Sequence, residues 1–139
     1  MASSLEESVR ADVKTYSEEL IRCIEEDVLA GDSRDAVKGA LAYLVNPGDL
    51  IEDSIPNLGL VDDATVLVTV SKLILEANEL GDVLTRDRVA SDFAEYEKRK
   101  GLIMTNVGKI TLEGMAVRGR KETDEKALLD QVRAKVAGL

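Results

Sequence analysis

Two prolines, two glycines and five acidic residues interrupt an otherwise apolar stretch over residues 40–64. Proline cannot continue a helix that precedes it, and the residue before a proline avoids the helical region of backbone space. We therefore expect one helix to end at Asn46, a short helix to begin at Pro47, and a turn to run from Pro56 to Gly59. The stretch predicts a proline-rich helix-turn-helix hairpin instead of one continuous helix.

Elsewhere, apolar residues recur every three or four positions, a spacing that places them on one face of a helix. Such stripes run over residues 5–28 and 128–136. Residues 66–77 are apolar on nearly every side, as expected of a helix at the centre of a bundle. The sequence therefore predicts an all-α fold, a compact bundle of five to six helices around an apolar central helix.

Capping residues and glycines predict where these helices begin and end within one domain over residues 1–139. Asp62, Thr85 and Thr123 each precede a helical stripe, and such side chains accept the first backbone N–H groups of a helix. Gly31 is expected to end the first helix, because glycine adopts the left-handed conformation at low cost. The expected parts are a long amphipathic helix over 1–31, a helical hairpin over 32–81, a helix over 82–101, and a basic segment with the C-terminal helix over 102–139.

The pattern is weakest over residues 102–120, where two short apolar runs flank Gly108. A hairpin fits these runs, since turn residues separate them. A helix weakened by three glycines fits as well, because each glycine costs up to about 1 kcal/mol in a helix interior. A segment that becomes ordered on binding is a third interpretation. The sequence leaves all three open.

The chain has no histidine, and Cys23 is its one cysteine. Without histidine it lacks the usual general base near neutral pH, so no Ser–His–Asp or Cys–His site can form within the chain. A single cysteine excludes an intrachain disulfide and a cysteine-only zinc site. Cys23 lies beside an apolar stripe and is expected to be a packed thiol. One unpaired thiol and no signal peptide favour a cytoplasmic location.

Charge is distributed unevenly along the chain, whose net charge is −9. Residues 1–97 carry 8 basic and 22 acidic side chains, whereas residues 98–121 carry 7 basic side chains against Glu113 alone. A body this acidic repels nucleic acid, so nucleic acid is not an expected partner. The basic stretch is expected either to bind a partner or to fold back on the acidic body or on a second copy.

Several residues of the proline-rich stretch match a known pattern: an apolar helix, a Pro-x-Asp turn, a second proline, a glycine, and Asp-Asp before another apolar helix. The matching residues are Ala40, Leu41, Tyr43, Leu44, Pro47, Asp49, Asp53, Ile55, Pro56, Gly59, Asp62, Asp63 and Ala64. This pattern resembles the signature of the YkvA-like family over about residues 37–75. The family has no assigned function, and its members often carry this segment as a membrane-associated hairpin. Gly48, Glu52 and Ser54 depart from the pattern and make this hairpin more polar.

The acids of this stretch suggest a divalent-metal site. Asp49 and Asp53 are four residues apart and share one face of a helix, and Asp62 and Asp63 follow across the predicted turn. Four converging carboxylates suit Mg²⁺ or Ca²⁺, and two metal ions in such a cluster suit hydrolysis of a phosphate ester. The alternative is that the acids begin helices, where the helix dipole favours them. Asp53 alone lacks that explanation.

The leading functional hypothesis is a small non-enzymatic helical protein that acts through protein–protein interaction, with another protein or as a homo-oligomer. No catalytic pattern and no cofactor motif is present, so no organic cofactor is expected. The alternatives are the metal site just described and a peripheral membrane protein that inserts its proline hairpin into the lipid surface. No apolar run is long enough to span a bilayer. The expected partner-binding residues belong to the acidic turn and to the start of the basic segment: Asp49, Glu52, Asp53, Lys98, Arg99 and Lys100.

Overall fold

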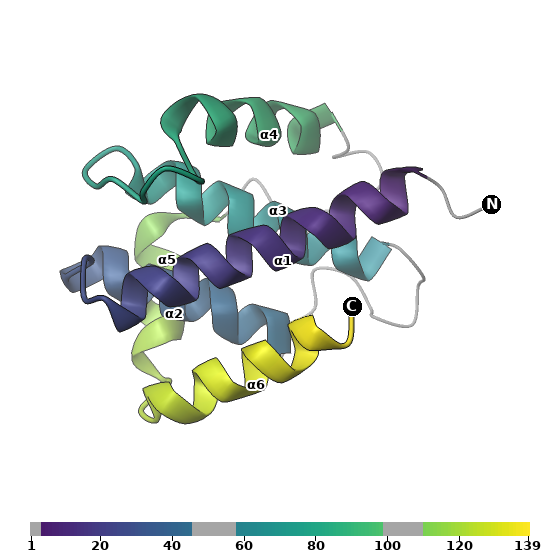
Figure 1. Cartoon of the computed structure of the whole chain (residues 1–139). Helices are drawn as coiled ribbons and strands as arrows, with labels where there is room; N and C mark the ends of the chain where they lie inside the picture. The colour runs from purple at the N-terminus through teal and green to yellow at the C-terminus, as the bar shows by residue number, and fades with distance from the viewer. Residues whose placement is uncertain (1–3, 46–57, 99–109) are drawn as a thin grey trace.

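The computed structural model describes residues 4–45, 58–98 and 110–139 (Figure 1). These residues form six helices and no strand, which confirms the predicted all-α bundle. Their stripes of Leu, Val, Ile and Ala pack into one hydrophobic core, in which the tyrosines are the largest side chains. The helices are α1 Ser4–Glu25, α2 Gly31–Val45, α3 Leu58–Ile74, α4 Arg86–Lys98, α5 Leu112–Arg120 and α6 Glu125–Ala137.

Helix α3 is the central helix of the bundle, as predicted. It contacts α1, α2, α4 and α5, and α1 crosses in front of it in Figure 1. Every side chain that the structure describes between Val61 and Ser71 is buried, because the sequence is apolar on nearly every side. Two buried hydroxyls on this helix are satisfied within it, since Thr65 donates to the Val61 carbonyl and Ser71 to the Leu67 carbonyl, whereas the buried Thr69 hydroxyl has no partner among the described residues.

Two boundaries of α3 differ from the prediction. The helix begins at Leu58, so Leu58 and Gly59 are helical and the turn predicted to end at Gly59 does not include them. Asp62 and Asp63 consequently lie inside the helix and do not begin it. The helix also ends at Ile74, before the end of the apolar pattern at residue 77, although turns continue the chain beyond it.

Helix α1 ends at Glu25, so the prediction of a helix reaching Gly31 is wrong. Asp27 adopts a left-handed backbone with φ of 55°, and its N–H bonds to the Ile24 carbonyl while the Val28 N–H bonds to the Cys23 carbonyl. This pair of bonds is a Schellman motif, which satisfies the last carbonyls of a helix. Val28, counted on the buried stripe, is consequently 49% exposed. A non-glycine residue provided the left-handed position, which the sequence pattern assigned to glycine.

Helices α2 and α5 cross at very close range because each contributes a glycine. A Cβ atom on Gly39 would lie 2.1 Å from the Met115 carbonyl oxygen, and one on Gly119 would lie 1.8 Å from the Asp35 carbonyl oxygen. The residues 112–120 therefore form a helix in which a glycine serves packing. The hairpin interpretation is wrong from Leu112 onward, and residues 102–109 lie outside the described residues.

The caps of the last helices agree with the prediction in one case and differ in the other. Thr85 begins α4 and accepts the Arg88 N–H, as predicted. Helix α6 is capped by Asp124, whose carboxylate accepts the Ala127 N–H, and not by Thr123. Both residues suit an N-cap, so the pattern alone does not decide between neighbours. The predicted stripe of α6 is buried throughout: Leu128, Leu129, Val132 and Val136.

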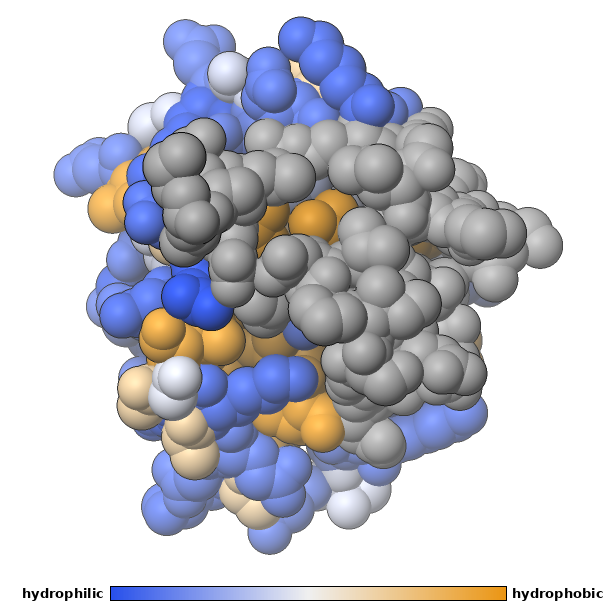
Figure 2. Space-filling model, turned by 90° about the vertical axis from the view of Figure 1, so that its right-hand side faces the viewer, coloured by the Kyte–Doolittle hydropathy of each residue, from blue (hydrophilic) through white to orange (hydrophobic). Residues whose placement is uncertain are grey.

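The described exterior is mostly hydrophilic. On the face drawn in Figure 2, charged and polar residues (blue) form most of the periphery, and hydrophobic residues (orange) reach the surface near the middle. The large exposed hydrophobic side chains are Val28, Val83 and Val117, which lie on three different parts of the chain. Single apolar residues scattered in this way are normal on a protein surface.

Candidate functional site

Most of the predicted site residues lie outside the described residues. This holds for Asp49 and Asp53 of the metal hypothesis, for Glu52 of the acidic turn, and for Arg99 and Lys100 of the basic segment. The metal hypothesis and the acidic-turn hypothesis therefore stay predictions. Within the ranges that the structure describes, no group of three or more acidic or cysteine side chains is arranged to hold a metal ion.

Asp63 occupies a structural position. Its side chain is 3% exposed, and its Oδ2 atom lies 3.9 Å from the Nζ atom of Lys135 on α6. Lys135 also donates a hydrogen bond of 2.5 Å to the Leu44 carbonyl, near the end of α2, where helix carbonyls lack partners within the helix. Lys135 of α6 thus contacts both α2 and α3, the two helices of the predicted hairpin.

Two cations of the basic stretch fold back on the acidic body. Arg120 on α5 lies 3.3 Å from Asp32 and 3.5 Å from Asp35 of α2, and the Arg118 guanidinium lies 5.0 Å from the centre of the Tyr43 ring. This confirms, for α5, the interpretation that the basic stretch contacts the body of the protein. Lys98, a predicted partner-binding residue, has a side chain that is 73% exposed and pairs only with Glu95 on its own helix among the described residues.

The chain forms a groove where α3 ends and α4 begins, at the upper left in Figure 1. Its main pocket has a volume of about 370 Å³, and a smaller hollow of about 170 Å³ continues between the two helices, sharing Leu75 and Arg86 with it. We call the two together the α3–α4 groove. The residues that line it are Lys72, Leu75, Glu76, Glu79, Leu80, Gly81, Leu84, Thr85, Arg86, Asp87, Val89 and Ala90.

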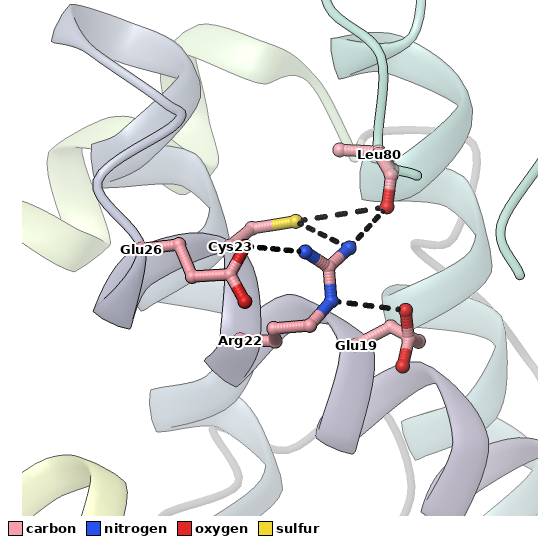
Figure 3. Close-up of polar contacts among 5 residues, drawn as sticks. All are labelled: Glu19, Arg22, Cys23, Glu26 and Leu80. Carbon is pink, nitrogen blue, oxygen red and sulfur yellow. Dashed lines mark hydrogen bonds and ion pairs between the residues drawn. The ribbon is translucent and has the colours of Figure 1, made fainter. Parts of the chain in front are cut away.

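Arg22 of α1 fixes the loop that forms this groove. Its Nη2 atom donates a hydrogen bond of 2.6 Å to the Leu80 carbonyl, and Glu19 and Glu26 hold the other side of the guanidinium (Figure 3). Gly81, the next residue, has a φ of 103°, and a Cβ atom there would lie 2.6 Å from the same Nη2 atom. The backbone conformation therefore favours glycine at this position, and a side chain there would also displace the Arg22 guanidinium.

Cys23 lies next to this contact and is fully buried, which confirms the predicted packed thiol. Its Sγ atom is 3.9 Å from the Leu80 carbonyl oxygen and 3.8 Å from Arg22 Nη2 (Figure 3). Burial raises the pKa of the Cys23 thiol, and the nearby Arg22 guanidinium lowers it by a smaller amount. A buried thiol with a raised pKa is a poor nucleophile, because the thiolate is the reactive form.

Helix α4, the other wall of the groove, is fastened to α1 by two matching hydrogen bonds. Tyr16 of α1 donates to Asp92 of α4, and Tyr96 of α4 donates to Asp12 of α1, each at 2.7 Å. Both tyrosines are buried. Burial, followed by the bond to Asp92, raises the pKa of the Tyr16 hydroxyl. These bonds hold α4 in place, so the groove is a fixed feature of the bundle.

The groove combines an apolar floor with a charged rim, on which three acids outnumber the two cations Lys72 and Arg86. Leu75, Leu80 and Leu84 are at most 5% exposed, whereas Glu76, Glu79 and Asp87 are exposed. In the described part of the chain these three carboxylates make no hydrogen bond or ion pair. Asp82 adds a fourth acid on the connecting loop, and Val83 beside it is 40% exposed.

Sequence reasoning did not find this groove. The signal was present, because Glu76 and Glu79 follow the apolar run of α3 at helical spacing and Asp87 lies in the first turn of α4. Taken singly, acids are ordinary near helix N-termini and on solvent-exposed faces. Their gathering around one pocket depends on how the loop folds back, and that depends on Arg22, which is far away in sequence.

The fold is thus an all-α bundle whose α2–α3 hairpin is completed by α5 and α6. Comparison with known protein families gives one match, to a protein family of unknown function (DUF1232), over residues 36–69. The YkvA-like pattern belongs to this family, so the predicted resemblance is confirmed over that short segment. No curated protein and no solved structure matches the chain. None of the described helices is long and apolar enough to cross a membrane.

Proposed function

We propose that this protein acts without catalysis of its own, by binding a basic segment of another protein in the α3–α4 groove. The observation that carries the proposal is the groove itself: a pocket of about 370 Å³ with a leucine floor and acidic side chains on its rim. Pockets of this size hold ligands or partner side chains when an apolar surface is combined with a few directed polar groups.

The charge of the rim selects the partner. Lysine and arginine have long apolar stems and a charged end, so their stems can cover Leu75, Leu80 and Leu84 while their cations meet the rim. Glu76 and Glu79 are not neutralised by described residues, and a partner cation would gain their attraction without displacing an existing ion pair. An acidic partner would gain less, because the acids of the rim outnumber Lys72 and Arg86.

A defined peptide tests this proposal. Fluorescence anisotropy would measure binding of a labelled amphipathic peptide of leucine and arginine, with a leucine–glutamate peptide as its counterpart. We expect the arginine peptide to bind, more weakly as salt is raised, and the glutamate peptide not to bind. The variant Glu76→Lys/Glu79→Lys should weaken binding about tenfold or more, since each exposed ion pair contributes about 0.2–1 kcal/mol and becomes a repulsion.

A matched control separates the groove from overall charge. Glu7→Lys/Glu18→Lys makes the same change in net charge on exposed positions of α1 that do not line the groove. The proposal predicts that the control binds the peptide nearly as the unmodified protein does. Equal binding by the unmodified protein and Glu76→Lys/Glu79→Lys would refute it, as would equal weakening in the control.

The same variants also identify partners in cells. A protein recovered in stoichiometric amount by the unmodified chain and by the α1 control, but not by the groove variant, would be a partner at this site. A second copy of this chain is the alternative occupant, because residues 98–121 are themselves basic. Sedimentation that shows concentration-dependent association, lost in the groove variant, would identify that case. The acidic turn and Lys98, Arg99 and Lys100 stay predicted contact surfaces, for which the corresponding charge changes are the test.

The two other hypotheses are kept as proposals with their own tests. A divalent-metal site on Asp49, Asp53, Asp62 and Asp63 predicts a melting temperature that rises with Mg²⁺ or Ca²⁺, because a ligand of the folded state stabilises it by mass action. A peripheral membrane role predicts co-sedimentation with lipid vesicles. For location we propose the cytoplasm, supported by the single, unpaired and buried Cys23.

A further inference from the structure

A second groove lies between α1 and α6, which contact each other directly. Its volume is about 310 Å³, at the lower end of the range of small-molecule sites. Ile21 and Val136 provide its buried apolar surface, and Lys14, Glu18 and Arg133 provide charged groups. We call it the α1–α6 groove. None of its described lining residues also lines the α3–α4 groove.

Ser17 is the unusual residue of this groove. It lines the groove, it is fully buried, and within the described residues its hydroxyl has no hydrogen-bond partner. Buried hydroxyls nearly always have a partner, and one left without costs about 1–3 kcal/mol. Ser71 shows the usual arrangement on α3, since its equally buried hydroxyl donates to the Leu67 carbonyl at 2.8 Å. The Ser17 hydroxyl therefore has an unused capacity to bond a molecule in the groove.

Two cations, Lys14 and Arg133, line the groove together with Ser17. Arg133 is held in place by a bond of 2.6 Å from Nη2 to Glu25, and a guanidinium has further N–H donors beyond that one. Lys14 makes no hydrogen bond or ion pair with the described residues. Among the residues that the structure describes, Glu18 is the carboxylate that lines the groove. Lys14 and Glu18 are exposed side chains that line the groove beside Ser17.

We propose that the α1–α6 groove binds a small aliphatic carboxylate. The Ser17 hydroxyl donates a hydrogen bond to the carboxylate, Lys14 and Arg133 supply the opposite charge, and the aliphatic chain lies on Ile21 and Val136. Hydrogen bonds to a charged group are about twice as strong as neutral ones, so the carboxylate uses Ser17 better than an alcohol does. This site is independent of the proposed protein-binding function, because the two grooves are separate.

Calorimetric titration with octanoate, octanol and octylamine tests the proposal, since the three probes share one chain and differ in the head group. We expect octanoate to bind, and octanol and octylamine to bind at least tenfold more weakly. Ser17→Ala should weaken octanoate binding about tenfold, which corresponds to the loss of one hydrogen bond to a charged group. Lys14→Gln should weaken it as well. Octanol binding as tightly as octanoate, or no binding of octanoate, would overturn the proposal.

The stability of the ligand-free protein gives a second readout. Ser17→Ala removes a buried hydroxyl without a partner, so its unfolding midpoint should be unchanged or higher. Ser71→Ala is the matched control: it removes a bonded hydroxyl, so it should lower the midpoint and leave octanoate binding unchanged. A lower midpoint for Ser17→Ala would show that the hydroxyl is used within the protein, and the proposal would fail.

Discussion

Replacing Gly119 by alanine should separate α2 from α5. The added Cβ atom would lie 1.8 Å from the Asp35 carbonyl oxygen and 2.8 Å from the Gly39 nitrogen, and both are backbone atoms that cannot turn aside. Ordinary contact begins near 3.4 Å, so the helices would have to move apart by roughly 1.5 Å, which removes most of the dispersion attraction across the interface. Overpacking of this kind costs about 3 kcal/mol or more.

The opposing effect is known and smaller. Alanine is a better helix former than glycine by up to about 1 kcal/mol, so the net loss in unfolding free energy should be about 2 kcal/mol or more. For a chain of this length that corresponds to a fall in Tm of roughly 5–10 °C.

Urea unfolding followed by circular dichroism measures this loss, and Gly138→Ala is its control. A Cβ atom on Gly138 meets nothing closer than 3.5 Å, and its φ is −83°, so alanine is accepted there without strain. The control should be as stable as the unmodified protein or slightly more stable. If Gly119→Ala unfolded at the same urea concentration as Gly138→Ala, the close crossing of α2 and α5 would be wrong.

Two further predictions concern the hydrogen bonds and ion pairs between helices. Tyr16→Phe should lower the unfolding free energy by about 1.5–3 kcal/mol at neutral pH, because it removes a buried bond to the Asp92 carboxylate. The raised pKa of Tyr16 keeps its hydroxyl protonated in the folded state at a pH where the same hydroxyl ionises in the unfolded chain. The unfolding free energy should therefore fall above about pH 10, and it should fall less steeply in Tyr16→Phe. Urea unfolding at a series of pH values measures both slopes. Lys135→Met should cost about 2–4 kcal/mol, since it leaves the buried Asp63 carboxylate without its ammonium. Adding Asp63→Asn to Lys135→Met should restore part of that loss in the same assay, and a double variant less stable than Lys135→Met would contradict the ion pair.

Local patterns predicted the helices well and their ends less well. Thr85 was correctly placed at the start of α4, because the threonine and the stripe that follows it agree. At the end of α1 two residues can take the left-handed conformation, and the pattern favoured Gly31 although Asp27 ends the helix. At the start of α3 the pair Asp62 and Asp63 looked like a cap. The helix instead begins earlier, at Leu58.

The candidate sites were harder to predict, because their residues come together only in the folded chain. Glu76 and Asp87 lie on different helices, and the loop between them is positioned by Arg22 of α1. Ser17 looks like an ordinary polar residue at the edge of an amphipathic stripe. Ser17 stands out because its hydroxyl has no hydrogen-bond partner in the described residues. The spacing of residues in the sequence does not predict a missing hydrogen bond.

The segment over residues 36–69 that matches the family does not form a complete packing unit on its own. Gly39 is one half of a crossing whose other half is Gly119, and Asp63 is one half of an ion pair whose other half is Lys135. Both partners lie far beyond the segment, on α5 and α6. A glycine that weakens one helix and a carboxylate buried in another are unfavourable taken alone. They become favourable only when α5 and α6 pack against the hairpin, so the segment and the C-terminal helices are expected to fold as one unit.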